Sequence, residues 1–373
     1  MNAQTVLTAV MAAFALLGAG DRIIGNRFGL GKAFEEGISS VGPLCLSMVG
    51  MICLSPVLTG LLRPFAEGFF GLFGADPAML GGMLLACDMG GAPLAESLAN
   101  DLDAGRFAGY IVSSMMGVTV VFTIPAAMEL VPEGCRERML QGILCGVAVI
   151  PVGCVVGGLT AGYSLRLIAC NTLPVLLLSG ILAAGLRFAP RWSVRILAVF
   201  GKGVAALITV GLGCGIFTAL TGVTLIPGMT PIREAFASLA DIVLLLAGAF
   251  PLITALKWAL RMPMRAVGRL LGISGEAVAG LLSTLANSIP TFSHLGEMDA
   301  RGQVLNMAFA VSAAFVFGDH LGYTSGLCPS MTLPLIAAKL SAGLCALPLA
   351  CRVTKPLYEL HKNQMQIGET EHD

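Results

Sequence analysis

Long uncharged and mostly apolar runs alternate with short charged stretches along this 373-residue chain. The longest runs cover residues 1–20, 38–62, 107–128, 139–165, 167–186 and 203–232. Each reaches the roughly 20 residues that a helix needs to cross a ~30 Å hydrocarbon layer. With the shorter apolar runs, the pattern predicts hydrophobic segments centred near residues 11, 50, 86, 117, 150, 177, 211, 248, 285, 311 and 338. We therefore predict an all-α, polytopic integral membrane protein with about 10–11 transmembrane helices.

Three of these segments are interrupted by polar residues, glycine or proline. The third contains Asp88 and Glu96 on either side of Gly90-Gly91-Ala92-Pro93, the ninth contains Asn287-Ser288-Ile289-Pro290, and the tenth ends in Gly318-Asp319-His320. A helix broken at membrane depth frees backbone groups that neighbouring protein or water must satisfy. The interruptions therefore predict broken or re-entrant helices at the centre of the protein.

An internal repeat appears when the chain is shifted on itself by about 198 residues, because the interruptions of the third and ninth segments then coincide within a residue or two. Paired interruptions in two halves are typical of a transporter's central binding site. We predict a first membrane repeat over residues 1–163, a linker helix and basic loop over 164–202, a second repeat over 203–352 and a polar tail over 353–373. Whether the repeats are parallel or inverted stays open, since segments three and nine either cross the membrane or re-enter.

Composition supports the membrane assignment and limits the partners. Hydrophobic residues make up 56% of the chain and charged residues 12%, and the mean hydropathy is +0.86, whereas a soluble domain has about 25% charged residues. The net charge is zero, which predicts membrane lipids and no nucleic acid as partners. Lysine and arginine divide almost evenly between the loops of the two predicted sides, so charge does not orient the chain clearly.

The cysteines and histidines do not form a metal-binding or nucleotide-binding motif. The eleven cysteines include no Cys-x-x-Cys pair, and most lie inside apolar runs, where cysteine acts as a small hydrophobic residue. The four histidines are scattered at positions 294, 320, 361 and 372. We predict no metal site and no cofactor.

The carboxylates set most deeply in apolar sequence are Asp88 and Asp319, one in each repeat, with Asn287 in the position equivalent to Asp88. A charged side chain inside a membrane segment is a functional site by default. A small protonated amine needs one carboxylate as counter-charge and further acceptors for its ammonium protons. A hydroxyl on the same ligand needs an amide or a hydroxyl. We predict a substrate site at these three residues, completed by Ser114, Thr119 and Ser288.

His320 and Glu96 are predicted to gate this site or to couple it to protons. Simpler interpretations stay open: Asp319 caps a helix at the water interface, Glu96 lies at the interface, and the small residues between Ser113 and Thr119 allow close helix packing. Lys339, in the last segment, either extends to the interface or pairs with a carboxylate.

Two other functions would also fit the predicted carboxylates. Two membrane aspartates could form the dyad of an intramembrane aspartyl protease, but its Gly-x-Gly-Asp signature is absent because Val316 precedes Phe317-Gly318-Asp319. A permease for another small primary amine would keep the architecture. The few Trp and Tyr residues argue against an aromatic cage for a quaternary ammonium. The oligomeric state stays open, with a homodimer as one alternative.

Several long strings of residues resemble one known family, the ethanolamine permeases of bacterial ethanolamine-utilisation operons (EutH). They are Phe34-Glu35-Glu36-Gly37, Met48-Val49-Gly50-Met51, Leu84-Leu85-Ala86-Cys87-Asp88-Met89-Gly90-Gly91, Ser114-Met115-Met116-Gly117, Thr284-Leu285-Ala286-Asn287, Met298-Asp299 before Arg301-Gly302, Ala308-Phe309-Ala310-Val311-Ser312-Ala313-Ala314-Phe315 and Gly318-Asp319-His320-Leu321-Gly322. The chain departs from the family pattern at Val118, Ser288 and Ser293. The resemblance implies a multi-pass carrier, and not an enzyme, that brings ethanolamine across the bacterial inner membrane to a cytosolic ammonia-lyase pathway.

Overall fold

The computed structural model describes residues 3–355 and consists of helices, with no strand in that range. Seven helical stretches are long and apolar enough to cross a membrane, so the prediction of an all-α polytopic membrane protein is confirmed. The stretches are Leu30–Gly71 (α2, Leu30–Ser39; α3, Val41–Leu44; η1, Cys45–Val49; α4, Gly50–Gly71), Leu102–Leu130 (α7, Leu102–Arg106; η3, Phe107–Gly117; η4, Thr119–Thr123; α8, Ile124–Leu130), Glu133–Thr160 (η5, Glu133–Cys135; α9, Arg136–Thr160), α10 (Leu165–Phe188), α11 (Pro190–Thr221), the first part of α12 (Ile232–Leu271) and Pro329–Val353 (η7, Pro329–Met331; α17, Thr332–Val353).

The remaining four predicted segments are α1 (Ala3–Ile23) and the three that the sequence marks as interrupted. The third consists of α5 (Met79–Leu84), η2 (Cys87–Met89) and α6 (Gly91–Leu98). The ninth consists of α13 (Gly275–Ala286) and α14 (Ile289–Ser293), followed by η6 (Leu295–Glu297). The tenth consists of α15 (Ala300–Ala313) and α16 (Asp319–Leu327). Each interruption in the sequence is therefore a break between short helices.

The third segment is a re-entrant hairpin, because its two ends meet. The carboxylate of Asp76, just before α5, accepts hydrogen bonds from the backbone N–H groups of Asn100 and Asp101, just after α6, both at 3.1 Å. A segment that crossed the membrane would have its ends about 30 Å apart. We call residues 76–101 the first hairpin.

The ninth segment has the same plan. The backbone N–H of Ser274 donates to Asp299 Oδ1 at 2.7 Å, and the other oxygen of Asp299 caps α15 at the N–H of Gly302. Residues 274–299 are the second hairpin. The helix starts Gly91 and Ile289 lie 198 residues apart, the spacing at which the two sequences align. The division of the whole chain into two repeats, a linker and a tail stays a prediction, and residues 356–373 of that tail lie outside the described residues.

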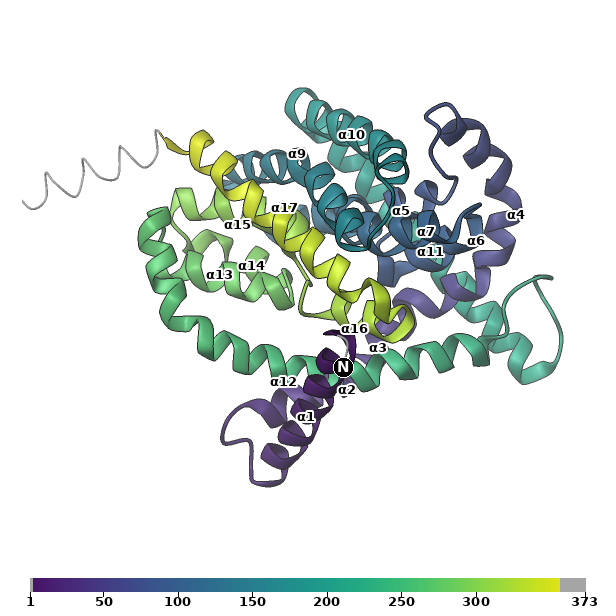
Figure 1. Ribbon diagram of the computed structural model, residues 1–373, viewed down its shortest axis with the longest axis horizontal. Coiled ribbons are helices and arrows are strands. Elements are labelled where there is room, and N and C mark those ends of the chain that lie inside the picture. Colours follow the sequence, from purple (N-terminus) through teal and green to yellow (C-terminus); the bar gives the residue numbers. More distant parts are fainter. Residues whose placement is uncertain (1–2, 356–373) are drawn as a thin grey trace, which may run out of the picture.

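The two hairpins enter the molecule from opposite ends (Figure 1). The first opens beside the start of α10, where the N–H of Asp76 donates to Asn171 Oδ1 at 2.8 Å. The second opens beside the start of α9, where Arg138 Nε donates to Gln303 Oε1 at 2.6 Å. Since α9 has 25 residues, these two ends are roughly 37 Å apart along its axis. The broken tips of the hairpins therefore meet in the middle.

The two ends differ sharply in positive charge. The end at which the second hairpin opens, where α9 and α11 begin and where α10, α12 and α17 finish, carries Arg136, Arg138, Arg187, Arg191, Arg195, Arg269, Arg301 and Arg352. The opposite end carries Arg63, Arg106, Arg166 and Arg233. Because cytoplasmic ends of membrane helices are enriched in Lys and Arg, this asymmetry predicts that the second hairpin opens to the cytoplasm.

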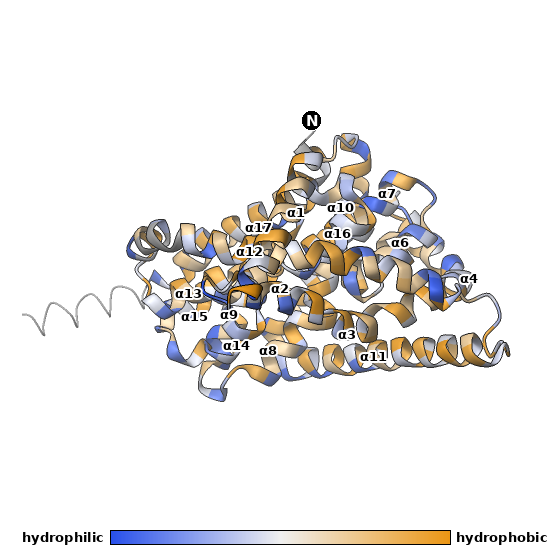
Figure 2. Ribbon diagram, turned by 90° about the horizontal axis from the view of Figure 1, so that it is seen from below, coloured by the Kyte–Doolittle hydropathy of each residue, from blue (hydrophilic) through white to orange (hydrophobic). Residues whose placement is uncertain are grey.

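The side of the molecule formed by α10 and α11 exposes large apolar side chains, such as Leu176, Ile181, Ile196, Val199 and Val210. Figure 2 shows α11 as a long and largely hydrophobic helix along one edge of the molecule. An apolar surface of this extent suits contact with lipid tails.

Glycine allows α4 and α11 to cross closely. A Cβ at Gly50 would overlap the Ile208 carbonyl oxygen and lie 2.6 Å from the Leu212 nitrogen, whereas a Cβ at Gly60, further along the same helix, has no atom within 4 Å. Small residues of this kind let membrane helices pack backbone to backbone.

We expect Gly50→Ala to destabilise the protein by about 1–3 kcal/mol, because the added methyl group must push two backbones apart. Gly60→Ala is the matched control and should leave stability nearly unchanged. Thermal unfolding of the detergent-purified variants measures the difference. Equal melting temperatures for the two variants would contradict the close crossing.

The orientation is tested with Thr224→Cys, in the exposed loop before α12, and Gly134→Cys, in the exposed turn before α9. A membrane-impermeant maleimide should label Thr224→Cys in intact cells and Gly134→Cys only after the membrane is opened, because Gly134 lies at the Arg-rich end. The reverse pattern would mean that the second hairpin opens to the outside. Labelling of the unsubstituted chain measures the background that comes from its own cysteines.

Candidate functional site

The tips of the two hairpins line one cavity of about 280 Å³ in the middle of the molecule. Both predicted carboxylates reach it, together with one residue from the tip of each hairpin and two aromatic rings. The lining residues are Ser40, Pro43, Leu44, Ser47, Ala86, Asp88, Met89, Val118, Phe122, Asn287, Ile289, Phe315, Asp319 and His320. The structure therefore brings together Asp88, Asn287, Asp319 and His320, which are far apart in the sequence.

Asp88 lies on the single turn η2 between α5 and α6, and its side chain is 17% exposed. The break forms because Leu85 and Ala86 are extended and Gly90 adopts a left-handed conformation with φ of 92°. Gly90 is needed here for a second reason, since a Cβ would collide with Met51. The carboxylate thus projects into the cavity from a non-helical turn at the start of α6.

Asn287 and Ser288 form the corresponding tip of the second hairpin. Asn287 is extended, and its side-chain oxygen accepts the N–H of Ile289 at 2.8 Å. Its side-chain NH₂ remains as the donor that faces the cavity. Ser288 is fully buried, and its hydroxyl has no hydrogen-bond partner within residues 3–355.

Asp319 and His320 begin α16, and the segment before them is held against the end of α13. The N–H groups of Phe315 and Phe317 donate to the carbonyls of Thr284 and Leu285 at 3.1 and 2.9 Å. His320 Nε2 lies 3.7 Å from Asp88 Oδ1, and the His320 side chain is 1% exposed. Because the N-terminus of a helix carries partial positive charge, the first turn of α16 stabilises the Asp319 carboxylate.

Phe315 and Phe122 form the aromatic wall of the cavity, with ring centroids 5.6 Å apart. Phe315 also lies 5.2 Å from the His320 ring. Its φ of 63° is uncommon for a bulky residue, and strained residues of this kind cluster at ligand sites. The faces of phenyl rings attract cations, so this wall suits a positively charged ligand.

Four predicted residues lie outside the lining of this cavity, namely Ser114, Thr119, Ser288 and Glu96. The Thr119 hydroxyl donates to the Met115 carbonyl at 2.6 Å, and the Ser114 hydroxyl donates to the Ile111 carbonyl at 3.0 Å. Glu96 is exposed on α6 and hydrogen-bonds to Tyr110. The Thr119 hydroxyl also reaches the Val311 carbonyl of α15 at 3.3 Å, so both hydroxyls are engaged by backbone carbonyls.

Lys339 on α17 is fully buried and does not extend to the interface. Its ammonium donates a hydrogen bond to the Ser114 carbonyl. It also interacts electrostatically with Asp88 and Cys87. The sequence left open whether Lys339 extends to the interface or pairs with a carboxylate, and it did not assign this lysine to the site.

Two further cavities continue from the central one along the second hairpin. A cavity of about 240 Å³ shares Asn287 and Asp319 with it and reaches Glu36 and Lys257. Another of about 280 Å³ shares Ser283 and Pro290 with the second cavity and reaches His294 and Glu297. The series runs toward the Arg-rich end of the molecule.

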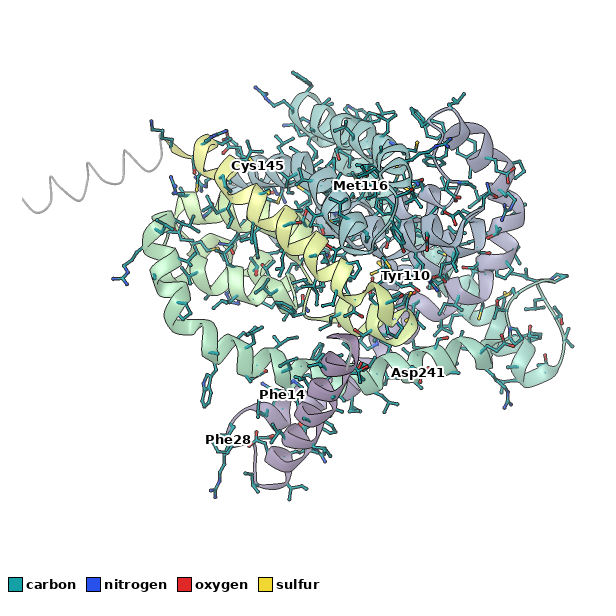
Figure 3. The ribbon with its side chains drawn as sticks, in the orientation of Figure 1. Phe14, Phe28, Tyr110, Met116, Cys145 and Asp241 are labelled. Atoms are coloured by element: carbon teal, nitrogen blue, oxygen red, sulfur yellow. The ribbon has the colours of Figure 1, made fainter. Side chains whose placement is uncertain are left out.

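Toward the opposite end, two tyrosines fill the space beyond Asp88. Tyr110 and Tyr323 are 2% and 0% exposed, and their ring centroids are 6.4 Å apart. Tyr323 interacts electrostatically with Asp88 at the cavity and with the exposed Glu96, so it lies near both. Figure 3 shows Tyr110 in the interior and Asp241 on the peripheral helix α12. The sequence did not identify this tyrosine pair, because each lies in a different apolar segment.

Cys87, Asp88 and His320 each place a ligand atom within 4.8 Å of the other two. Thiolate, carboxylate and imidazole are ligands that zinc accepts. The Lys339 ammonium near Asp88 and Cys87 opposes a divalent cation there. That the protein binds no metal ion at this site stays a prediction.

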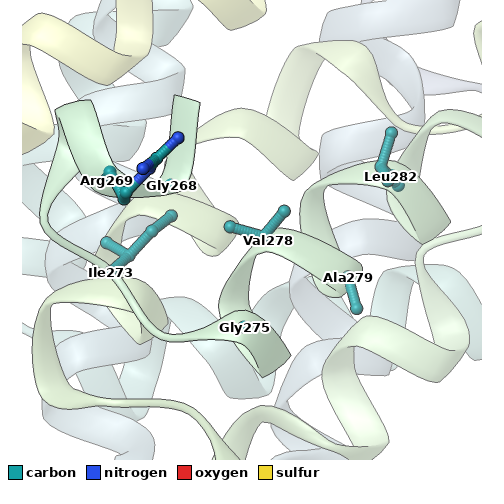
Figure 4. Close-up of a pocket in the computed structure, with 7 residues that line it drawn as sticks. All are labelled: Gly268, Arg269, Ile273, Gly275, Val278, Ala279 and Leu282. Atoms are coloured by element: carbon teal, nitrogen blue, oxygen red, sulfur yellow. The ribbon is translucent and has the colours of Figure 1, made fainter. Parts of the chain in front are cut away.

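Another cavity, of about 440 Å³, lies elsewhere, between the end of α12 and the start of α13. Arg269 is its single charged lining residue, beside Ile273, Val278 and Leu282 (Figure 4). It does not share a lining residue with the central cavity.

Comparison with known proteins places the chain in one family. The family model described as "Ethanolamine utilisation protein, EutH" matches residues 3–353. A probable ethanolamine permease EutH from Listeria monocytogenes is 44% identical, over 98% of this chain and 98% of that protein. One from Salmonella typhimurium is 39% identical over 94% and 95%, and an uncharacterized protein, YxeR, from Bacillus subtilis is 39% identical over 95% and 96%. No solved structure matches the chain.

Proposed function

The chain belongs to the family of the ethanolamine utilisation protein EutH, and we propose that it takes up ethanolamine as the protonated amine. The family is one of permeases, so the protein is a multi-pass transporter and not an enzyme. Its proposed place is the bacterial inner membrane, in contact with lipid along α10 and α11. Ethanolamine is the proposed partner, and neither nucleic acid nor a cofactor takes part.

The observation that carries this proposal is the Asp88 carboxylate in a cavity between two broken hairpins. The ammonium group of ethanolamine would pair with Asp88, with the phenyl faces of Phe122 and Phe315 beside it. Asp319 would supply a second acceptor. The Asn287 amide is the proposed partner of the ethanolamine hydroxyl, and the unpartnered hydroxyl of the neighbouring Ser288, which does not line the described cavity, would have to turn toward it to take part.

The series of cavities along the second hairpin suggests the route of release. We propose that the described conformation faces the Arg-rich, cytoplasmic end, with Asn287 and Asp319 between the central cavity and the next one. Tyr110 and Tyr323 would close the other side. His320 would sense the occupation of Asp88, and Glu96 would receive the amine outside the tyrosine pair.

Another small primary amine would use the same carboxylate, and competition between amines during uptake decides between the two ligands. The aspartyl protease is not pursued, because the relatives that carry a functional name are named permeases. A homodimer remains a proposal without a described interface.

Replacing Asp88 by Asn should nearly abolish uptake of labelled ethanolamine. Leaving a buried charge without its partner costs about 3 kcal/mol or more, which corresponds to roughly a hundredfold loss. Uptake is measured at about pH 5.5, where an alkylamine is almost wholly protonated and crosses lipid poorly unaided.

Asp241→Asn serves as the matched control, since Asp241 is exposed on α12 and does not line the cavity. It should transport as the unsubstituted chain does. Equal uptake by Asp88→Asn and Asp241→Asn, at equal amounts in the membrane, would remove Asp88 from the site.

The tyrosine closure is tested through Cys87, which is fully buried and interacts electrostatically with both Tyr110 and Tyr323. A membrane-impermeant cationic thiol reagent added outside cells should modify Cys87 slowly in the unsubstituted chain and several-fold faster in Tyr323→Ala. Peptide mass spectrometry measures the modified fraction of Cys87. Tyr163→Ala, at the same end of the molecule but bonded to Met331, is the control. Equal rates in both variants would show that Tyr323 does not close the site.

A further inference from the structure

Lys339 is a charged residue that the proposed site does not yet use. It lies in the middle of α17, is fully buried, and donates to the Ser114 carbonyl of the π-helix η3. A buried ammonium costs several kcal/mol unless other charges compensate it. A neutral residue would avoid this cost, so the position of Lys339 calls for an electrostatic explanation.

The compensating charges are those of the central cavity. Lys339 interacts electrostatically with Asp88 and Cys87 on the tip of the first hairpin and with His320 on α16. Asp319, also on α16, interacts with Asp88. The cluster thus contains two carboxylates, one lysine, one thiol and one imidazole, contributed by three elements that pack together.

A count of charges gives the preferred ligand. If both carboxylates are counted as ionised, Lys339 as protonated and the thiol and imidazole as neutral, the formal charges of the cluster are minus two plus one, a net charge of minus one. One monovalent cation brings it to zero. A dication would leave a positive charge enclosed, and a neutral molecule would leave a negative one. Closing a site away from water is easiest when its total charge is zero.

We propose that Lys339 sets the charge of the substrate, by supplying beside the cavity the positive charge that a second, co-transported cation would otherwise supply. The proposal rests on the function proposed above. In this arrangement the site accepts one monovalent ammonium at a time and does not need a sodium ion to balance its second carboxylate. Without Lys339 the same cavity would require two positive charges, either on one ligand or on two.

The best probe of this idea is 1,2-diaminoethane, which replaces the hydroxyl of ethanolamine by a second ammonium at nearly the same size. At about pH 5.5 both of its amines are predominantly charged. Uptake of labelled ethanolamine into proteoliposomes is measured with unlabelled ethanolamine or diaminoethane as competitor, in sodium and in potassium buffers. The quantity compared is the concentration of diaminoethane that halves the uptake of labelled ethanolamine, divided by the concentration of unlabelled ethanolamine that does the same.

In the unsubstituted protein, diaminoethane should compete at least about tenfold more weakly than ethanolamine, and sodium should not matter, because the excess charge must be enclosed. In Lys339→Met the ratio should shift toward diaminoethane by a similar factor, or ethanolamine uptake should become dependent on sodium. Lys339→Arg keeps the charge and should keep the preference for the monoamine. Lys339→Gln, which keeps a donor for the Ser114 carbonyl, gives the same comparison if Lys339→Met does not fold.

An unchanged ratio without sodium dependence in the neutral variants would overturn the proposal, as would equal competition by both amines in the unsubstituted protein. The failure of the proposed function looks different, since ethanolamine uptake would then be missing from the unsubstituted protein. In that case thermal stabilisation of the purified protein by ethylamine and by diaminoethane gives the same test. A preference for ethylamine that Lys339→Met or Lys339→Gln reverses supports the role of Lys339, and no reversal refutes it.

Discussion

The meeting of two broken hairpins at one cavity inside a membrane protein is the constraint on which the rest of the structure depends. A hydrocarbon layer offers no partner to a free backbone group, so neither hairpin tip could exist alone at that depth. Each is satisfied by the protein around it. The Asp88 turn is closed by hydrogen bonds within its own backbone and with the start of α6. At the end of α13, backbone carbonyls accept hydrogen bonds from the segment before Asp319. The irregular backbone is tolerated because it lines a cavity inside the protein.

The same arrangement explains why several charged groups gather there. Two helices begin beside the cavity, α6 after Asp88 and α16 at Asp319, and the partial positive charge at a helix start stabilises a nearby carboxylate. Lys339 adds a full positive charge from α17, held by the Ser114 carbonyl. The cluster is therefore internally balanced to within one charge, which is the charge of a protonated amine. In this view, selectivity comes from the charge balance of the whole cavity rather than from any single contact.

Because the two hairpins enter from opposite ends of the molecule, the routes from the two ends to the central cavity differ. Along the second hairpin the approach is hollow, and its lining includes the polar residues Asn287, Thr291 and His294 among apolar ones. Along the first hairpin the approach is filled by Tyr110 and Tyr323. A carrier needs such an asymmetry in each of its conformations, since a site open to both ends at once would conduct freely. The Arg-rich end coincides with the hollow approach, which is consistent with release into the cytoplasm.

The sequence by itself determined the membrane class, the position of the apolar segments and the three places at which they break, because hydropathy, proline and glycine act locally. It also singled out Asp88, Asn287 and Asp319, since polar residues in apolar runs are conspicuous. The EutH resemblance was visible in the same strings. The direction of each hairpin was decided only by tertiary contacts, such as those of Asp76 with Asn100 and of Ser274 with Asp299. Because a re-entrant segment returns to the side from which it came, an unrecognised hairpin shifts every later loop to the wrong side, and the charge asymmetry disappears from a linear count. Lys339, Phe315 and the tyrosine pair belong to the site only through contacts between residues distant in the chain, and no local pattern records them.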